Sequence, residues 1–555
     1  MASERMTMED IRNWITYNLS DQSKTWFSSP ADPKKYKEHA HENIPHSDVN
    51  AARNIHQTFQ HRIHYIPGNN AWHVWNGIFH EKIDGDLLAQ WLCNSFLDVH
   101  KTALEKVKDH YFAEAQQLSG KDRIAKMKDY TGGMFKEHRA YRDRIHFNSG
   151  LTGLVNQIKH VFSVPDNFFN DDRQWLVLMN GVLDLYDLKA NPPAPGDLNA
   201  VAARLLEHDA SRPVWRAVNA ELSPYKDSTR WRDYLATSLP DGELRKFLAV
   251  VTGAAFLAES KTKIIPVLKG RKDSGKTVFV DTLYLMAGGY GGQPDTSAIV
   301  RQSGPNFEQD QFRGLRFIGI TEPNTDRKVD DSFLKKLTGG DILSTRNLHA
   351  RSVEWRSQGI LFISTNGDLK FNTNDHAIVQ RFATVTFPYR FYPRGQIPEG
   401  KEDFVQDRTL DQDLLEEFDG ILNWVINGML VYLDEGIVIP ASVELERERQ
   451  VIEGNTDIAW LEEAVANYEA SFVIEETANR SNKSDYVALS DAHMEYCSWF
   501  VENADGNPLG KQQFRKDLLE YLDVDLIKSG VHRVPRLVYK DRIQGEELAQ
   551  KRPGF

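Results

Sequence analysis

The sequence predicts an α/β fold, in which short buried strands and helices alternate around a parallel sheet. Two observations lead to this prediction. Between residues 261 and 395, short runs rich in Ile, Phe, Leu and Val alternate with helical patterns, as expected for strands that are buried on both faces. A turn rich in Gly and Lys follows the first run and opens a helical pattern, and α/β sheets bind ligands at such turns.

The size and composition of the chain indicate a soluble protein of several domains. Its 555 residues exceed what one hydrophobic core normally covers, and its 41% apolar and 26% charged residues are ordinary for globular proteins. We find no apolar run of about 18 residues and no signal-peptide pattern, so we expect no membrane association. The two cysteines, Cys93 and Cys497, lie far apart in the sequence, which favours a reducing, cytoplasmic location without a disulfide framework.

Residues 1–212 are expected to form an N-terminal domain of α+β type. Helical patterns surround an alternating apolar segment at residues 62–84, which turn signals divide into three short antiparallel strands. The second turn, at Asn76-Gly77, is typical of a type I′ hairpin, because Asn and Gly both tolerate positive φ. A similar Asn-Gly pair at residues 180–181 predicts a further hairpin.

Changes of pattern and charge divide the rest of the chain. We expect a helical collar or linker at 213–260, the strand–helix core at 261–395, an acidic helical subdomain at 396–480 and a C-terminal unit at 481–555. The acidic subdomain contains a long helical pattern that we expect to be interrupted at Gly420 and Gly428. The C-terminal unit is expected to hold two or three helices followed by a strand pair at 531–543.

The decisive motif lies at residues 270–277, GRKDSGKT, and fits the pattern G-x-x-x-x-G-K-[ST]. Its glycines allow a tight loop whose backbone N–H groups wrap phosphate oxygens, and the following helix points its positive end at the same anion. Lys276 would reach the β and γ phosphates, and Thr277 would supply a hydroxyl to Mg²⁺. We therefore expect ATP and Mg²⁺ at a site formed by Gly270, Asp273, Ser274, Gly275, Lys276 and Thr277.

Hydrolysis needs further groups around the γ-phosphate, and strand ends supply candidates. Three apolar runs are expected to be strands, at 264–268, 316–321 and 359–365. Glu322 ends the second run and is a candidate for binding Mg²⁺ and the attacking water, unless it is a solvated strand-end acid. Asn366 ends the third run and would orient that water, unless it simply starts a turn. Arg381 precedes another apolar run and would stabilise the transition state, although a lone arginine is usually a surface cation.

The charge of the chain is unevenly distributed. The net charge is −12, yet residues 261–360 hold 16 basic against 11 acidic residues, whereas residues 401–480 hold 5 basic against 20 acidic ones. Residues 342–358 alternate like a hairpin, and a basic hairpin suits sequence-independent contacts with DNA phosphates. The candidates for DNA contact are Lys335, Lys336, Arg346, His349 and Arg351. Instead of contacting DNA, these residues could form a solvated basic surface. The two lysines could also pair with acidic residues at a subunit interface.

Taken in order, the loop, Glu322, DDSFLKKLTGGDILSTRNLHA, ILFISTN and DHAIVQRFATVTFP resemble the superfamily 3 helicase domain of phage, plasmid and poxvirus primase-helicases. The resemblance extends over residues 60–545 and is strongest over 264–392. It implies an AAA+-like core, a winged-helix-like C-terminal unit and a homo-hexameric ring that moves 3′ to 5′ on single-stranded or forked DNA. It also implies that Glu322 is the acid of the second motif, that Asn366 is the sensor, and that Arg381 is a finger reaching the neighbour's ATP.

Two departures from that family qualify what the resemblance implies. The second motif commonly holds two adjacent acids, but Thr321-Glu322 offers one, which must serve both metal and water. Only about 60 residues precede the similar region, so we expect a helicase without primase activity, served by a primase or polymerase in trans. The resemblance leaves two other functional classes open, namely a ring ATPase for DNA packaging or protein remodelling, and a replication initiator or scaffold that uses nucleotide only to assemble.

Eight of the 18 histidines lie between His39 and His80, which raises the question of a metal site. Only the pair His61 and His64 has a suitable spacing, and no cysteine accompanies it, whereas structural zinc sites normally use mixed Cys and His sets. We therefore expect no metal there. Trp72 and Trp75, in the same segment, are expected in the core rather than on a base-stacking platform.

Overall fold

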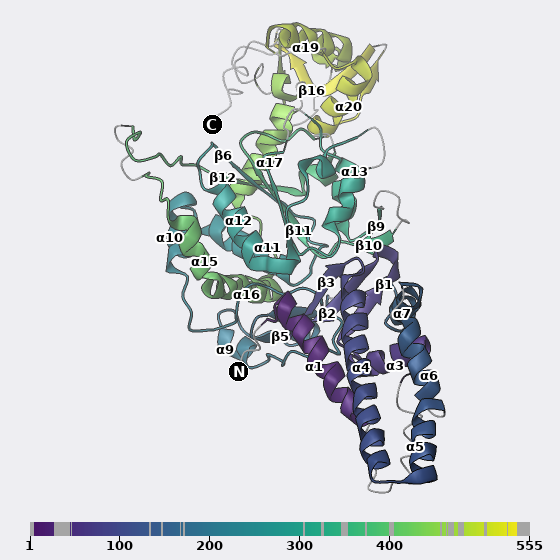
Figure 1. Ribbon diagram of the computed structural model, residues 1–555. Helices are drawn as coiled ribbons and strands as arrows, with labels where there is room; N and C mark the ends of the chain where they lie inside the picture. Colours follow the sequence, from purple (N-terminus) through teal and green to yellow (C-terminus); the bar gives the residue numbers. More distant parts are fainter. Residues whose placement is uncertain are drawn as a thin grey trace.

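Figure 1 shows the computed structural model of the chain, with a helix-rich N-terminal part, a central sheet between layers of helices, and a small C-terminal unit. The structure describes residues 5–26, 45, 47–132, 135–145, 148–166, 168–169, 173–302, 306–323, 327–345, 353–371, 375–398, 404–454, 458–461, 463, 471–475, 482–503, 508–529 and 531–540.

Five parallel strands form the central sheet, in the spatial order β12-β6-β11-β8-β7. Their bounds are β6 (Ile265–Gly270), β7 (Gly291–Gly292), β8 (Phe317–Thr321), β11 (Ile360–Thr365) and β12 (Phe382–Phe387). The three runs expected to be strands are β6, β8 and β11, so the prediction of an α/β fold with a parallel sheet is confirmed. The sequence pattern gives no sign of β7, because its two glycines carry no apolar signal.

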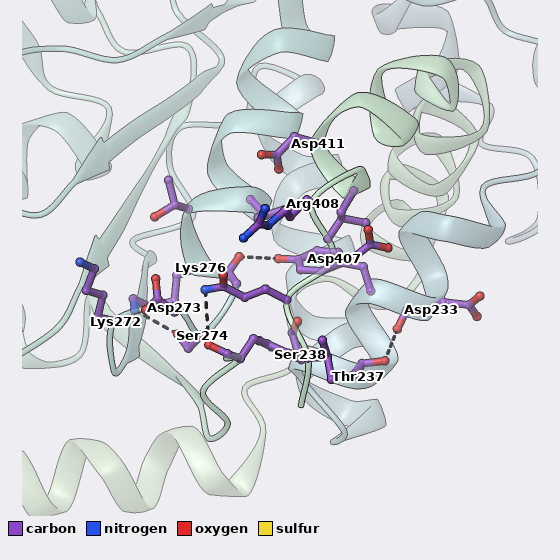
Figure 2. Close-up of a pocket in the computed structure, with 18 of the residues that line it drawn as sticks. Asp233, Thr237, Ser238, Lys272, Asp273, Ser274, Lys276, Asp407, Arg408 and Asp411 are labelled. Carbon is purple, nitrogen blue, oxygen red and sulfur yellow. Dashed lines mark hydrogen bonds between the residues drawn. The ribbon is translucent and has the colours of Figure 1, made fainter. Parts of the chain in front are cut away.

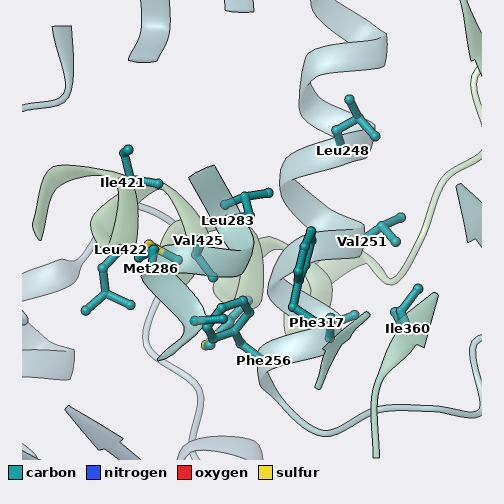
Figure 3. Packing of buried hydrophobic residues seen from close by; sticks show 14 of the residues in the cluster. Leu248, Val251, Phe256, Leu283, Met286, Phe317, Ile360, Ile421, Leu422 and Val425 are labelled. Atoms are coloured by element: carbon teal, nitrogen blue, oxygen red, sulfur yellow. The ribbon is translucent and has the colours of Figure 1, made fainter. Parts of the chain in front are cut away.

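Both faces of this sheet are buried, as the apolar runs predict. Ile360 and Phe362 of β11 face one hydrophobic cluster, which includes α11 (Gly242–Phe256), α12 (Lys276–Ala287) and α16 (Phe418–Glu435). Leu361 and Ile363 face the opposite cluster, which includes α13 (Asp331–Gly339) and α14 (His376–Val379). Figure 3 shows the first cluster, with side chains of α11, α12 and α16 meeting those of the sheet. Each fully buried side chain of this kind contributes about 1.5–3 kcal/mol, so the sheet is a rigid base for the loops at its edge.

Helices α11 and α16 pack with their backbones in close contact, and glycines make this possible. A Cβ atom at Gly428 would stand 2.1 Å from the carbonyl oxygen of Ala249, and one at Gly253 would stand 2.2 Å from the backbone nitrogen of Met429. The predicted interruption at Gly420 and Gly428 is therefore wrong, because α16 runs through both glycines. The break in the helical pattern lies instead between α15 (Leu410–Glu416) and α16.

The N-terminal part surrounds a three-stranded antiparallel sheet with helices. Its elements are α1 (Met8–Trp26), α3 (Asp48–Thr58), β1 (Ile63–Ile66), η1 (Pro67–Asn69), β2 (Ala71–Trp75), β3 (His80–Asp84), α4 (Leu87–Gln116), α5 (Gly120–Gly132), α6 (Phe135–Ile145) and α7 (Asn148–Val161). The three expected strands are present, in the order β1-β2-β3. In α1, the buried residues Ile11, Ile15 and Leu19 recur at helical spacing and face the common core.

The turn between β2 and β3 differs from the predicted type I′ hairpin. Trp75 pairs with His80, so the connection has four residues rather than two. The Asn76 side chain accepts hydrogen bonds from the backbone N–H groups of Ile78 and Phe79, both at 3.0 Å. The longer loop also buries Ile78 completely, which a two-residue turn would not allow.

A hairpin and short helices connect this part to the central sheet. They are β4 (Trp175–Leu178), β5 (Gly181–Asp184), α8 (Leu185–Ala190), α9 (Leu198–Ala202) and α10 (Thr229–Ser238). The hairpin expected at the second Asn-Gly pair is thus present. Leu176 and Leu183 belong to the same hydrophobic cluster as α11 and α12, so the hairpin packs on the helical layer of the core.

The remaining core segments are η2 (Gly288–Tyr290), η3 (Thr296–Ile299), η4 (Phe307–Phe312), β9 (Ile342–Thr345) and β10 (Val353–Arg356), and α17 (Ala441–Gly454) packs along β12. The C-terminal unit contains β13 (Phe472–Ile474), η5 (Lys483–Asp485), β14 (Tyr486–Ala488), α19 (Leu489–Asn503), α20 (Lys511–Leu522), β15 (Ile527–Ser529) and β16 (Val531–Tyr539). The strand pair predicted at 531–543 is wrong, because residues 531–539 form one strand, whose hairpin partner is β15. The winged-helix assignment of this unit stays a prediction. In the described ranges, no helix has the length and apolar character that crossing a bilayer requires.

Candidate nucleotide-binding site

The loop between β6 and α12 is a tight cradle that depends on glycine. Asp273 and Gly275 adopt the left-handed backbone region, with φ of 62° and 93°, which curls the loop over the start of α12. A Cβ atom at Gly270 would stand 2.6 Å from the carbonyl oxygen of Phe387 and 2.9 Å from Ser274 Oγ. A side chain at Gly270 would therefore distort the cradle.

Lys276, the first residue of α12, points its ammonium group back into this loop. Its Nζ donates hydrogen bonds to the carbonyl oxygens of Gly270 at 2.8 Å and Arg271 at 2.9 Å, to Ser274 Oγ at 3.0 Å, and to Asn366 Oδ1 at 3.1 Å. Burial lowers the pKa of this lysine, and nearby carboxylates oppose that shift. Because all four acceptors are uncharged, the positive charge stays available for an anion bound at the loop.

The predicted acid and the predicted amide meet at the ends of two neighbouring strands. Glu322 follows β8 and Asn366 follows β11. Asn366 Nδ2 donates to Glu322 Oε1 at 3.0 Å, while its Oδ1 accepts from Lys276. Glu322 has a φ of 49°, which is uncommon for a residue other than glycine and is typical of functional sites. The structure therefore brings Lys276, Asn366 and Glu322 into one polar chain.

A cavity of about 570 Å³ lies over the loop and is lined by residues from six parts of the chain. Thr277, Glu322 and Asn366 line it together with the loop. The opposite wall is formed by α10 and by residues 405–411, which the sequence analysis did not connect with the site. Figure 2 shows Lys276 on the side of the phosphate-binding loop, and Asp407, Arg408 and Asp411 on the side formed by residues 405–411.

Hydrogen bonds and ion pairs hold this opposite wall in place. Arg230 of α10 pairs with Asp407 and, at 2.8 Å, with Asp413 of α15. The hydrogen bond from Arg230, with others from Thr409, lowers the pKa of Asp407 to about 2. Tyr234, also on α10, donates its hydroxyl to the carbonyl oxygen of Gly275 at 2.7 Å, which ties this wall to the loop.

Arg408 is the cation of this wall that remains open to the cavity. It is exposed, it lines the cavity, and it forms no hydrogen bond or ion pair with any other part of the chain that the structure describes. No local pattern marks it in the sequence, because it lies about 130 residues after the loop, in a segment without a motif.

These residues fit a nucleoside triphosphate with Mg²⁺. A Cβ atom at Gly270 would fill the space inside the cradle. Lys276 and the amino terminus of α12 favour an anion there. The cavity has the size of ordinary ligand pockets. Thr277 and Glu322 supply a hydroxyl and a carboxylate at the same cavity, and oxygen donors are the ligands that Mg²⁺ prefers.

Arg381 lies at the opposite end of the parallel strands from this site. It immediately precedes β12, and its carbonyl oxygen accepts from the backbone N–H of Ile265, at the start of β6, at 2.6 Å. The loop follows the other end of β6, roughly 16 Å away at the ordinary rise of a strand. The Arg381 side chain donates through Nε to Thr338 Oγ1 at 2.8 Å and through Nη1 to the carbonyl oxygen of Ala377. Within one subunit, Arg381 is therefore not brought together with Lys276.

The predicted basic hairpin is present as the antiparallel pair β9 and β10. The last residue of β9 is tied to the core, since Trp355 Nε1 donates to Thr345 Oγ1 at 2.8 Å and that hydroxyl donates to Asp310 at 2.7 Å. Lys336, on α13 before the hairpin, is exposed, whereas Lys335 forms an ion pair with Asp375 of the same chain. The other three candidates, Arg346, His349 and Arg351, lie between β9 and β10 in the sequence, outside the described residues.

Three of the N-terminal histidines, His64, His73 and His80, belong to an aromatic core cluster. The His73 ring stacks on Phe169 at a centroid distance of 4.3 Å, and the His64 and His80 rings lie 5.1 Å apart. Both ring nitrogens of His80 contact backbone carbonyl oxygens. Trp72 is fully buried in the adjacent core. Among the described residues, no three His, Cys, Asp or Glu side chains are grouped as metal ligands.

Comparisons with known proteins give a consistent family relationship. Residues 52–237 match the family described as "D5 N terminal like". Over 407 residues, the chain is 19% identical to the protein named "Putative helicase L207/L206" of Acanthamoeba polyphaga mimivirus, covering 71% of this chain and 38% of that protein. Over 242 residues, it is 23% identical to "Putative helicase 022R" of Frog virus 3 (isolate Goorha), covering 40% of this chain and 25% of that protein. The chain thus spans less than two-fifths of the length of these relatives.

Among solved structures, the apo C-terminal region of NrS-1 is similar to this chain. The match covers 58% of this chain and 77% of that one, at 12% sequence identity and a TM-score of 0.36. A second apo structure of the same region gives 13% identity and the same TM-score.

Proposed function

From its relationship to the viral superfamily 3 primase-helicase family, we propose that this protein is an ATP-dependent DNA helicase that works as a hexameric ring. The observation that carries the proposal is the polar chain of Lys276, Asn366 and Glu322 at the phosphate-binding loop. The names of the viral relatives support the same activity.

In this proposal, each loop binds one MgATP. Lys276 would exchange its carbonyl contacts for phosphate oxygens, and Thr277 and Glu322 would hold Mg²⁺, which neutralises developing charge on the phosphates when it is bound. Asn366 would align the attacking water, since its amide already bridges Lys276 and Glu322. Glu322 would accept a proton from that water and also serve the metal, because Thr321 offers no second carboxylate.

The position of Arg381 supports a ring in which subunits share each nucleotide. To act on its own subunit's nucleotide, Arg381 would have to reach across the length of β6, so in this proposal it serves the nucleotide of a neighbour. Head-to-tail contacts of this kind repeat around a closed ring. Arg381 would then stabilise the transition state on the neighbouring loop, a role that is worth about 10³–10⁵ in rate.

The hairpin formed by β9 and β10 would contact the DNA backbone in the channel of this ring. Lys336, His349 and Arg351 would supply positive charge for sequence-independent phosphate contacts. Lys335 is less available for DNA, because it already pairs with Asp375. If His349→Ala combined with Arg351→Ala leaves unwinding unimpaired, the hairpin has no part in DNA contact.

One experiment tests the proposal against its alternatives. ATP hydrolysis and unwinding of a forked DNA duplex are measured for the wild type, Lys276→Ala and Arg381→Ala. We expect Lys276→Ala to lose ATP binding, and Arg381→Ala to bind ATP normally but to hydrolyse it about 10³-fold more slowly. Hydrolysis that is indifferent to single-stranded DNA would indicate a packaging or remodelling motor. Oligomers without turnover would indicate an initiator or scaffold.

A further inference from the structure

The buried arginine Arg447 contacts the backbone on both sides of Arg381. It lies on α17, which packs along β12, the edge strand of the central sheet. Its Nε donates to the carbonyl oxygen of Phe382 at 2.7 Å, and its Nη2 donates to that of Gln380 at 2.6 Å. Its Nη1 pairs with Glu444 at 2.7 Å, one turn earlier on the same helix. All three nitrogens of one guanidinium are therefore engaged.

These contacts fix the orientation of the segment that carries Arg381. The carbonyl groups of residues 380 and 382 point to α17, whereas that of Arg381 points to β6 and accepts from Ile265. Residues 380 and 381 form the turn that precedes β12, and the Arg381 side chain is directed to α13, where Thr338 accepts from it. The backbone of Arg381 is thus held from both sides, by a neighbouring strand and by one planar side chain.

Burial makes this arrangement costly unless it has a purpose. Arg447 is only 7% exposed, and a buried charge is often replaced without loss by an apolar side chain of similar volume. A leucine or methionine would fill the space between α17 and β12, but it would leave two edge carbonyls without a donor. The guanidinium meets both carbonyls with its fixed fork of N–H groups, which a lysine cannot do.

We propose that Arg447 is a positioning residue for Arg381, which holds the guanidinium of Arg381 in the orientation needed to reach the nucleotide of the neighbouring subunit. This inference rests on the proposed function, because it requires Arg381 to act between subunits. A second contact from the same helix, between Gln450 Nε2 and Thr384 Oγ1 at 3.1 Å, fixes α17 along the same strand.

The test compares Arg447→Met with Glu444→Gln in the full chain. The first removes both donors to the strand, whereas the second weakens only the ion pair and leaves those donors in place. We expect Arg447→Met to lower kcat by about 10–100-fold, because a displacement of about 1 Å in a catalytic group has effects of this size. ATP affinity and KM are expected to stay within about twofold of wild type, and Glu444→Gln to keep the wild-type kcat.

Mixed oligomers separate this role from a merely structural one. Lys276→Ala subunits cannot use ATP but carry intact Arg381 and Arg447. When they are mixed in equal amounts with Arg447→Met subunits, about a quarter of the interfaces pair a working loop with an intact finger. We therefore expect turnover to recover well above the level of either variant alone. A structural defect in the Arg447→Met subunit would persist in the mixture.

A parallel mixture of Arg381→Ala with Lys276→Ala distinguishes the two possible failures. If this mixture recovers activity and the Arg447→Met mixture does not, the positioning role is wrong while the proposed function stands. If neither mixture recovers, the finger does not act between subunits, and both proposals fail. Should Arg447→Met not fold, Arg447→Lys replaces it, since a lysine keeps the charge and donates to one of the two carbonyls. Wild-type kcat in Arg447→Lys would overturn the inference.

Discussion

Substituting Gly275 by alanine would disturb the phosphate-binding loop in two measurable ways. Gly275 has a φ of 93°, and a left-handed backbone costs a residue with a Cβ about 1–2 kcal/mol. The new Cβ would also stand 2.8 Å from Ser238 Oγ and 3.1 Å from Tyr234 Cε2, both on α10. Relieving such an overpacked contact costs about 1–3 kcal/mol. The two effects together amount to about 2–5 kcal/mol against the loop shape that binds phosphate.

We expect this cost to appear mainly in nucleotide affinity, because the free loop can shift away from α10 whereas the occupied loop cannot. Since each 1.4 kcal/mol corresponds to a tenfold change, the dissociation constant for ATP should rise by at least about 30-fold. The measurement is a titration with a fluorescent ATP analogue in the presence of Mg²⁺. Thermal unfolding of the same samples without nucleotide would show whether the free protein carries part of the cost.

Two further variants identify the origin of the effect. Gly196→Ala is the matched control, because Gly196 has a φ of 86° but no atom within 4 Å of its Cβ position and no contact with the cavity. It should lower the free energy of unfolding through the left-handed backbone alone and leave ATP binding unchanged. Combining Gly275→Ala with Ser238→Ala removes the closest contact and should restore part of the affinity. Wild-type affinity in Gly275→Ala would refute the role that we assign to this loop geometry.

Three other predictions follow from the same structure. Burial lowers the pKa of His64 to about 3 and of His73 to about 4. The free energy of unfolding is therefore highest above about pH 6.5, and it falls as the pH is lowered because the unfolded chain gains protons that the folded protein does not bind. We expect a loss of about 3–4 kcal/mol between pH 7 and pH 5 in urea unfolding followed by tryptophan fluorescence, and an unchanged midpoint would exclude this cluster as the cause. Asn366→Ala should lower kcat by about 10²-fold with ATP affinity within about threefold in steady-state and binding assays, and a pure affinity loss would contradict the water-aligning role. Thr338→Val removes the acceptor of Arg381 Nε and should lower the ATPase rate by about tenfold, whereas an unchanged rate would show that this hydrogen bond does not orient the finger.

The sequence predicts the centre of the candidate site well because its parts are set by short-range rules. The glycine and lysine pattern specifies the loop, and apolar runs specify the strands on either side. Glu322 and Asn366 end two such strands, and parallel strands bring their carboxyl ends to one edge of a sheet, so their contact follows from the fold class.

The walls of the cavity and the close helix contacts are beyond the reach of the sequence pattern. Arg230 and Arg408 are far from the loop in the chain and reach it only because α10 and α15 pack together on the core. Gly428 looks like a helix breaker in the sequence, but its lack of a side chain lets α16 approach Ala249 of α11. In the β2–β3 loop, hydrogen bonds to the side chain of Asn76 stabilise a four-residue turn in place of the expected two-residue one, and the burial of Ile78 favours the longer turn. In each case, tertiary packing overrides a local preference.

In the proposed ring, α13 links Arg381 to the protein hairpin formed by β9 and β10, which would contact DNA. Thr338 on α13 accepts from Arg381, and Lys335 on the same helix pairs with Asp375, which caps the short helix before Arg381. The chain leaves α13 through Gly340 directly into β9, and Arg356 of β10 donates back to the carbonyl oxygen of Gly340. A change in the position of Arg381 at a neighbour's γ-phosphate would therefore move α13 and the base of the hairpin together, since two contacts hold finger and helix as one unit. Hydrolysis on one subunit would thus displace the DNA-contacting hairpin of the next, and that coupling requires no long chain of intermediate residues.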